Sequence, residues 1–369
     1  MRTTLLLLVL AMPWTAHAYD LEHDSDGSQV RWAGTLTLYV DAHSRTVSQA
    51  DVLAAMNRAA QHWATIAAVD VSVESESEHG TPGYDPSKGE DNRSEVIFED
   101  DEWDYDPDVA ATTLVTMDTV THQILDADIL VNEWQNRFGI LPDDSKSGQG
   151  LLLDLEGCLT HELGHALGLA HTPDHPEATM FGATLPGEIS KRELAKDDEA
   201  GVQFIYGTPG NAKHEPTAGC SSGVGPEGLA ILFAAVILLW RGPRRRDTRM
   251  LMRASVFAGL AVMVAASAWA EGSGTAQHLA PKVEKRVQGQ VTRTLASWQG
   301  GRIYTDVEVN VETCVEGTCN AVESYRVPGG TIGRIRQVLA DVQVPVPGDH
   351  VDASLIRATD GRLKLSLRR

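Results

Sequence analysis

Three histidines and a glutamate lie close together in one short segment of the chain. Residues 161–165 read His-Glu-Leu-Gly-His, and Gly168 and His171 follow. On a helix, His161 and His165 lie one turn apart on one face, so their imidazoles can bind one metal ion. Gly168 can end the helix in a left-handed conformation, and the returning chain can supply His171 as a third ligand. A surface helix rich in histidine is the alternative, but a pattern of eleven residues rarely arises by chance.

The position of Glu162 beside these histidines suggests hydrolysis. Three neutral histidine ligands leave one tetrahedral position open, which is typical of a catalytic rather than a structural zinc. Zinc lowers the pKa of a bound water to about 7. Glu162 would take the proton from this water as it attacks a peptide carbonyl, and would pass it to the leaving amine. We therefore expect a zinc endopeptidase; the alternative is a catalytically inactive zinc-binding surface protein that acts as a binding module.

The same segment, His161–His171, resembles the zinc-binding helix of the metzincins, and specifically of the bacterial matrixins, which are matrix-metalloprotease-like endopeptidases. The resemblance covers about residues 30–207. It implies an α+β catalytic domain with a twisted, mostly parallel sheet and three helices. It also implies a catalytic zinc bound by His161, His165 and His171.

Three further segments extend this resemblance. In the family, a methionine in a tight turn packs beneath the zinc, and Met180 stands at the matching place. Leu194–Gly207 is similar to the family's closing helix, and Ile124–Ile129 is similar to its edge strand. An edge strand has unpaired N–H and C=O groups and can bind an extended peptide by strand addition. The resemblance therefore implies protein or peptide substrates.

The chain departs from the matrixin pattern at three places. Gly182 stands two residues after Met180, where the family usually has a proline, so the pocket on the primed side is expected to differ. Residues 19–30 contain no cysteine and leave no room for a propeptide, so latency through a propeptide cysteine is not expected. The family's structural zinc loop is not recognisable, because His122 alone does not form one.

Composition and charge restrict the class of protein. The 369 residues are 42% hydrophobic and 22% charged, which excludes a disordered acidic tail and a polytopic membrane protein. Residues 19–220 hold 38 acidic and 11 basic side chains, whereas residues 221–369 hold 13 and 19. The sign of the charge therefore changes near Cys220, which indicates two parts. The net charge of −20 argues against nucleic-acid binding, because phosphates would be repelled.

The N-terminal residues indicate export. Residues 1–18 have the layout of a signal peptide, with a charged start, a short apolar run and the cleavage motif Ala16-His17-Ala18. We expect the protease domain to occupy 19–210 and a linker to occupy 211–227.

Two apolar segments follow the linker. Residues 228–240 are apolar and precede a basic loop at 241–253, an arrangement that resembles the C-terminal surface-sorting tails of myxobacterial exported proteins. Residues 254–270 have a second signal-peptide layout. Either the two segments form a membrane hairpin with a cytoplasmic basic loop, or two exported precursors have been joined. We expect an extracytoplasmic protein, at the cell surface or secreted, that associates with the membrane through its apolar segments.

Acidic and thiol side chains provide secondary candidates. The run Glu99–Asp108 could hold Ca²⁺ through several carboxylates, and a solvated acidic loop is the plainer interpretation. Cys158 lies one turn before His161 and could approach the zinc, but a buried core cysteine fits it better. Cys220 could accept a lipid or mark a processing point; an ordinary thiol near the membrane is the alternative.

Periodicity predicts the elements of the catalytic part. Ser48 can cap a helix over 49–67, and further helices are predicted at about 150–169 and 190–206. Strands are predicted at about 35–40, 69–73, 96–98, 112–117 and 123–131.

The last part of the chain, 271–369, indicates a small all-β accessory domain, either a barrel or a sandwich. Cys314 and Cys319 close a short loop, and a hairpin disulfide is expected there in an oxidising compartment. Nothing in this part has catalytic spacing. Strands are predicted at 303–311, 321–327, 342–346, 351–357 and 363–367.

Overall fold

A computed structural model of the chain describes residues 19–212 and 283–365, with the exception of 42, 77, 90, 91, 102, 104, 106, 107, 341 and 358–360. These residues fall within one compact unit. The predictions for the signal peptide, the linker from residue 213 onward, both apolar segments, the basic loop and Cys220 lie outside the described residues. Within the described ranges, no helix combines the length and the apolar character needed to cross a bilayer.

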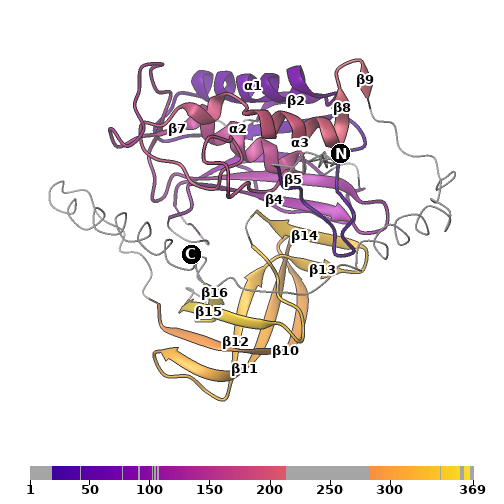
Figure 1. The fold of residues 1–369 in the computed structure, drawn as a ribbon, viewed down its shortest axis with the longest axis vertical. Coiled ribbons are helices and arrows are strands. Elements are labelled where there is room, and N and C mark those ends of the chain that lie inside the picture. The colour runs from indigo at the N-terminus through magenta and orange to yellow at the C-terminus, as the bar shows by residue number, and fades with distance from the viewer. Residues whose placement is uncertain are drawn as a thin grey trace, which may run out of the picture. The chain divides into compact units, whose positions relative to one another are not determined.

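A seven-stranded mixed sheet forms the centre of the described fold (Figure 1). The pairs β1–β2, β1–β3 and β3–β5 are parallel, whereas β4–β5, β14–β4 and β13–β14 are antiparallel. The α+β class is therefore confirmed, and the sheet is mixed rather than mostly parallel. In spatial order the strands are β13 (Gly330–Ile332), β14 (Ile335–Leu339), β4 (Ala111–Asp118), β5 (Gln123–Asn132), β3 (Ser94–Glu99), β1 (Leu36–Asp41) and β2 (Val71–Glu76).

The two faces of this sheet pack against different partners. Because side chains alternate along a strand, Ile129 and Val131 of β5 enter the core beneath the helices, whereas Leu130 enters a second core shared with the C-terminal strands. Figure 1 shows the helices on one side of the sheet and most of the C-terminal strands on the other. Strands β4 and β5 are consequently buried along almost their whole length.

Three α-helices cover the first face of the sheet: α1 (Gln49–Ile66), α2 (Leu155–Ala166) and α3 (Lys196–Tyr206). The predicted cap of α1 is confirmed, because the Ser48 side chain accepts a hydrogen bond from the Asp51 backbone N–H. The apolar stripe of α1 is buried as its helical spacing predicts, at Val52, Ala55, Met56, Ala59 and Trp63.

Two predicted helices are shorter than expected. Helix α2 begins only at Leu155, because Asp154 caps it through the Gly157 N–H at 2.9 Å. The preceding pair Leu153–Asp154 is strand β7, which pairs with β6 (Phe138–Gly139). The helix predicted at 190–206 is divided into a 3-10 turn at Ser190–Arg192 and α3. A two-stranded ladder follows α3, formed by β8 (Gly207–Thr208) and β9 (Asn211–Ala212).

Most strands of the C-terminal part form a closed barrel, which agrees with the predicted small β barrel or sandwich, whereas β13 and β14 join the central sheet. The predicted disulfide between Cys314 and Cys319 is present. The strand predicted at 342–346 is wrong; Pro345, which cannot donate to a ladder, interrupts it. The barrel strands, in order around the barrel, are β10 (Lys285–Gln299), β11 (Arg302–Glu316), β12 (Val322–Pro328), β16 (Leu363–Leu365) and β15 (His350–Arg357).

The expected edge strand requires a correction. The segment Ile124–Ile129 belongs to β5, which pairs with β3 on one side and with β4 on the other, so it lies inside the sheet. Among the strands from the N-terminal part, β4 rather than β5 lies at this edge of the sheet. The edge of β4 is not open, because β14 pairs with it. Periodicity could not distinguish β4 from β5, because both are buried on both faces.

Candidate metal centre

The imidazole rings of His161, His165 and His171 converge on one point. His161 Nε2 lies 2.9 Å from His171 Nε2 and 3.2 Å from His165 Nε2. The three residues form one of two groups of potential metal ligands among the described residues. The three histidines that the sequence spacing predicted as metal ligands therefore lie together in the structure.

The other ring nitrogens of two of these histidines fix their orientation. His161 Nδ1 donates to the Thr179 carbonyl at 2.6 Å, and His165 Nδ1 donates to the Leu169 carbonyl at 2.8 Å. With the proton on Nδ1, each Nε2 presents its lone pair to the common point, as a zinc ligand must. Burial, reinforced by the two neighbouring imidazoles, holds the pKa of His161 well below its ordinary value. The donor set therefore fits a divalent metal of the zinc type.

Glu162 is buried beside the three rings. Its Oε2 accepts a hydrogen bond from Thr113 Oγ1 of β4 at 2.7 Å, and its backbone carbonyl accepts from the same hydroxyl at 3.1 Å. One threonine thus holds both the carboxylate and the backbone of the candidate general base. A carboxylate oriented in this way beside a metal can accept and return a proton.

The predicted helix end and the predicted methionine both occupy their expected places. Gly168 has a φ of +95°, and a Cβ there would lie 2.9 Å from the Val30 carbonyl, so the sharp return of the chain toward His171 requires glycine. Met180 is buried against Gly164, where a Cβ would overlap the methionine sulfur. The methionine therefore packs directly against the helix that carries two of the histidines.

Two charged residues hold the turn that contains Met180. Asp198, at the start of α3, accepts hydrogen bonds from Thr179 N at 2.7 Å and from Met180 N at 3.0 Å. The buried Lys191 Nζ donates to the Thr179 carbonyl at 3.0 Å and also to the Phe181 carbonyl. Burial lowers the pKa of Lys191. Because the Thr179 carbonyl also accepts from His161, both residues act on the histidine through the turn.

Gly182 has a packing role that the sequence did not reveal. An added Cβ would overlap the His171 ring at Nδ1 and Cε1. A proline or any other larger residue would therefore displace the third histidine from its position in this structure. The absence of the family's usual proline is thus linked to the placement of His171.

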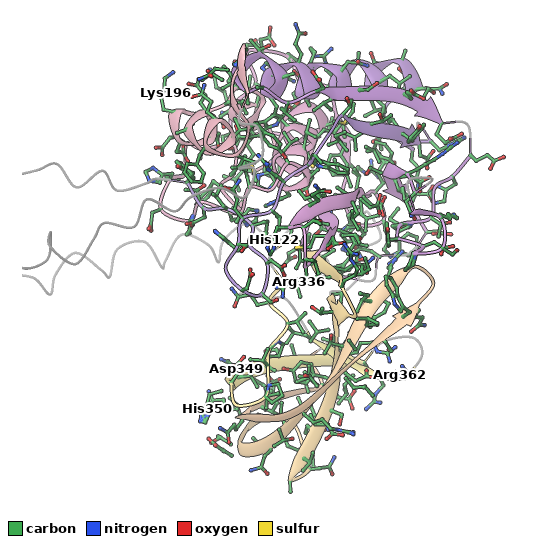
Figure 2. The ribbon with its side chains drawn as sticks, turned by 90° about the vertical axis from the view of Figure 1, so that its right-hand side faces the viewer. His122, Lys196, Arg336, Asp349, His350 and Arg362 are labelled. Carbon is green, nitrogen blue, oxygen red and sulfur yellow. A yellow bond between two sulfur atoms is a disulfide. The ribbon has the colours of Figure 1, made fainter. Side chains whose placement is uncertain are left out.

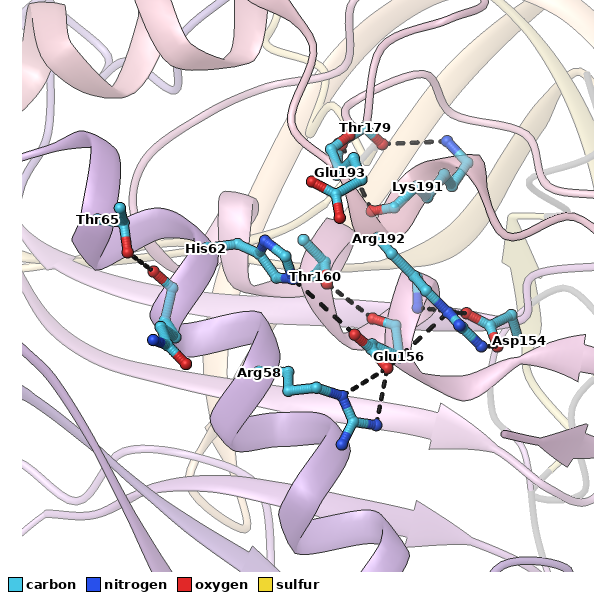
Figure 3. A network of polar contacts seen from close by, with 12 residues as sticks. Arg58, His62, Thr65, Asp154, Glu156, Thr160, Thr179, Lys191, Arg192 and Glu193 are labelled. Atoms are coloured by element: carbon cyan, nitrogen blue, oxygen red, sulfur yellow. Dashed lines mark hydrogen bonds and ion pairs between the residues drawn. The ribbon is translucent and has the colours of Figure 1, made fainter. Parts of the chain in front are cut away.

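The beginning of α2 is anchored by a network of ion pairs (Figure 3). Arg58 of α1 binds Glu156 at 2.7 Å, and Arg192 binds Asp154 at 2.6 Å. Arg192 also approaches Glu156, at 3.8 Å. In addition, Trp63 Nε1 donates to a carbonyl of α2, that of Thr160, at 2.9 Å. The helix that carries His161 and His165 is therefore fixed from two sides.

The secondary candidates do not join the metal centre among the described residues. Cys158 is a free, partly buried thiol that packs against the main core, as the plainer interpretation predicted. In the acidic run, Trp103 and Tyr105 are buried and pack edge to face at 5.0 Å. None of the described carboxylates of this run forms part of a group of potential metal ligands.

His122 has partners that the sequence did not indicate. Asp24 and Asp26 form the second group of potential ligands with it. Its two ring nitrogens face these carboxylates, at 3.2 Å for Nδ1 and Asp24 and at 3.8 Å for Nε2 and Asp26.

Comparisons with known proteins agree with this geometry. Residues 75–207 match the matrixin family model. A segment of 68 residues is 41% identical to metalloendoproteinase 1-MMP of Arabidopsis thaliana and covers 18% of each chain. A segment of 66 residues is 36% identical to human matrilysin, with 18% of this chain and 24% of matrilysin covered. A segment of 72 residues is 43% identical to the macrophage metalloelastase of Oryctolagus cuniculus, with 20% and 14% covered.

The matched segments span less than a quarter of each of these relatives. The range matched by the family model, by contrast, contains strands β3, β4 and β5, the three histidines, the turn with Met180 and the closing helix. Residues 75–207 are therefore similar to a matrixin domain.

Proposed function

We propose that this chain is an exported zinc-dependent endopeptidase that hydrolyses peptide bonds of extracellular proteins. The observation that carries the proposal is the convergence of three Nε2 atoms next to a buried glutamate that Thr113 holds in place. The names of the relatives, which include metalloendoproteinases and a metalloelastase, support the same reaction class.

Each residue of the centre has a role in this proposal. His161, His165 and His171 would hold the zinc through their Nε2 atoms. When bound, zinc supplies a Lewis acid that polarises the scissile carbonyl and acidifies an attacking water. Glu162 takes the proton from that water and gives it to the leaving amine nitrogen. Thr113 keeps the carboxylate in one orientation through both proton transfers.

The experiment compares the zinc-loaded full chain with its Glu162→Ala variant on a broad peptide library. Because Glu162 is not a ligand, the variant should retain zinc but cleave about 10²-fold to 10⁴-fold more slowly. Zinc content measured by atomic absorption is the control for metal loss. The same comparison is made in a chain that also carries Ala340→Pro, a substitution that weakens the pairing between β14 and β4. If neither the zinc-loaded wild-type chain nor the zinc-loaded Ala340→Pro chain cleaves better than the same chain with Glu162→Ala, the protein is the inactive binding module instead.

The proposal includes export to an oxidising compartment. The signal-like layout of residues 1–18 supports export, and so does the disulfide between Cys314 and Cys319, because such bonds persist mainly outside the cytoplasm. Membrane association through residues 228–240 and 254–270 and the boundaries of the domains stay predictions from the sequence.

A further inference from the structure

Strand β14 covers the outer side of β4 next to the metal centre. The ladder runs from Ile335 opposite Asp118 to Leu339 opposite Leu114. It continues for one residue beyond the strand, where Ala340 N donates to the Thr113 carbonyl at 2.9 Å. In Figure 2, Arg336 of β14 lies where the C-terminal strands meet the sheet.

This ladder ends at the residue that holds the candidate general base. The Thr113 carbonyl accepts from Ala340, and the Thr113 hydroxyl donates to Glu162 at 2.7 Å. Two hydrogen bonds therefore connect the backbone of the C-terminal segment to the Glu162 carboxylate. The covered edge is the part of the sheet beside the reacting groups, and not a distant side of it.

An extended peptide substrate would need the same backbone groups. An extended peptide can bind by adding a strand to an exposed sheet edge, where main-chain hydrogen bonds supply the affinity. In the N-terminal part of the sheet, β4 is the terminal strand that packs against α2. A peptide that lies along β4 and presents its carbonyl to the metal centre would compete with residues 335–340 for the outer backbone N–H and C=O groups of β4.

The C-terminal segment is fitted to this edge by its side chains as well. Gln337 is fully buried, and its Nε2 donates to Thr116 Oγ1 of β4 at 3.1 Å and to the Gly301 carbonyl at 3.0 Å. Arg334 forms an ion pair with Asp118 at the far end of the ladder. These contacts join β14 both to β4 and to the barrel, so the barrel holds the segment in place.

We propose that residues 335–340 act as a built-in competitor for the substrate-binding edge of β4, so that the full chain is autoinhibited until this segment leaves. The inference rests on the proposed endopeptidase function.

The test weakens the ladder at the bond nearest Glu162. Ala340→Pro removes the N–H that donates to Thr113, and Ala340→Gly retains it as the matched control. In the zinc-loaded full chain, the loss of this bond should raise the rate of cleavage of fluorescein-labelled casein about fivefold or more over the control. Hydrogen exchange at the amides of Ala111–Met117 reports whether the edge has opened.

A second pair of variants locks the edge. Leu114 and Leu339 lie directly opposite each other, so Leu114→Cys with Leu339→Cys can form a disulfide between the strands. The oxidised form should cleave casein more slowly than the reduced form, and Leu339→Cys alone controls for effects of the reductant. Equal cleavage by the locked and reduced forms of a chain that cleaves casein would overturn the inference.

Binding separates this inference from the proposed function. In a Glu162→Ala background, Ala340→Pro should bind labelled casein more tightly than Ala340→Gly does, whether or not any form cleaves it. If Ala340→Pro binds casein more tightly but no form that retains Glu162 cleaves it, the proposed endopeptidase function is wrong, whereas the inference that residues 335–340 compete for the edge of β4 is supported. If neither binding nor cleavage differs between the two Ala340 variants and the cysteine pair, the segment does not compete and the inference fails.

Discussion

At the scale of single residues, the metal centre depends on close approaches that only small side chains permit. Gly164 allows Met180 to pack against α2, and Gly182 allows the His171 ring to take its place. The spacing of the histidines and Glu162 was sufficient to predict which side chains converge. It could not indicate Thr113 or Lys191, because these lie about 50 and 30 residues away in the sequence and reach the site only through the fold.

Gly182→Ala tests the role of this glycine. The added methyl group overlaps the His171 ring, so the ring must move and zinc affinity should fall about 10-fold to 100-fold, as it does when the support of a ligand is lost. Competition with a chromogenic chelator measures the affinity. Gly34→Ala is the control, because a Cβ there meets nothing within 4 Å. An unchanged zinc affinity would show that the position of His171 does not depend on Gly182.

At the scale of elements, the metal centre depends on contacts between two helices and a turn. Helix α2 supplies two histidines, the turn around Met180 supports them, and the start of α3 supports that turn. The sequence predicted α2 and α3 but placed their N-terminal ends too early. The true starts depend on Asp154 and Asp198, whose side chains accept backbone N–H groups near the helix starts. Several acidic residues near each helix could have served this purpose, so the sequence did not decide between them.

Asp198→Asn tests the link between α3 and the turn. The carboxylate accepts backbone N–H groups from Thr179, Met180 and Ala195, and an amide cannot accept all three. The free energy of unfolding should fall by about 2–4 kcal/mol, which urea denaturation of the full chain measures. Asp197→Asn is the matched control and should be neutral or stabilising, because one oxygen of Asp197 is buried without a hydrogen-bond partner. Equal losses in both variants would contradict the assignment.

At the scale of the whole described fold, the C-terminal strands are part of the same core as the sheet of the protease part. Ile97 and Leu130 from the sheet are buried in one cluster with Val307 and Leu355 from the barrel. The described fold also buries polar groups. Asp126 of β5 is fully buried, with Ser94 Oγ donating to one oxygen at 3.1 Å and with no hydrogen-bond partner at the other. Burial, with a smaller effect of Glu95, raises the pKa of Asp126 to about 8.

Asp126→Asn tests this buried carboxyl group. In the unfolded chain the group ionises near pH 4, but in the folded chain it stays protonated up to about pH 8. Its contribution to stability is therefore complete below pH 4 and is lost as the pH rises toward 8. The variant, which cannot ionise, should gain stability over the parent by a few kcal/mol between pH 5 and pH 8. Urea denaturation at the two pH values measures this gain, with the exposed Asp174→Asn as control; a difference that does not depend on pH would refute the prediction.

By itself, the sequence determined the local features of this protein. The helical spacing of His161 and His165, the glycine that turns the chain back to His171, and the short loop between Cys314 and Cys319 are each specified within a few residues. The tertiary structure alone decided which strand lies beside the metal centre and what covers it. Strand pairing joins residues more than 200 positions apart, such as Leu114 and Leu339, and no periodicity within one segment records its partner.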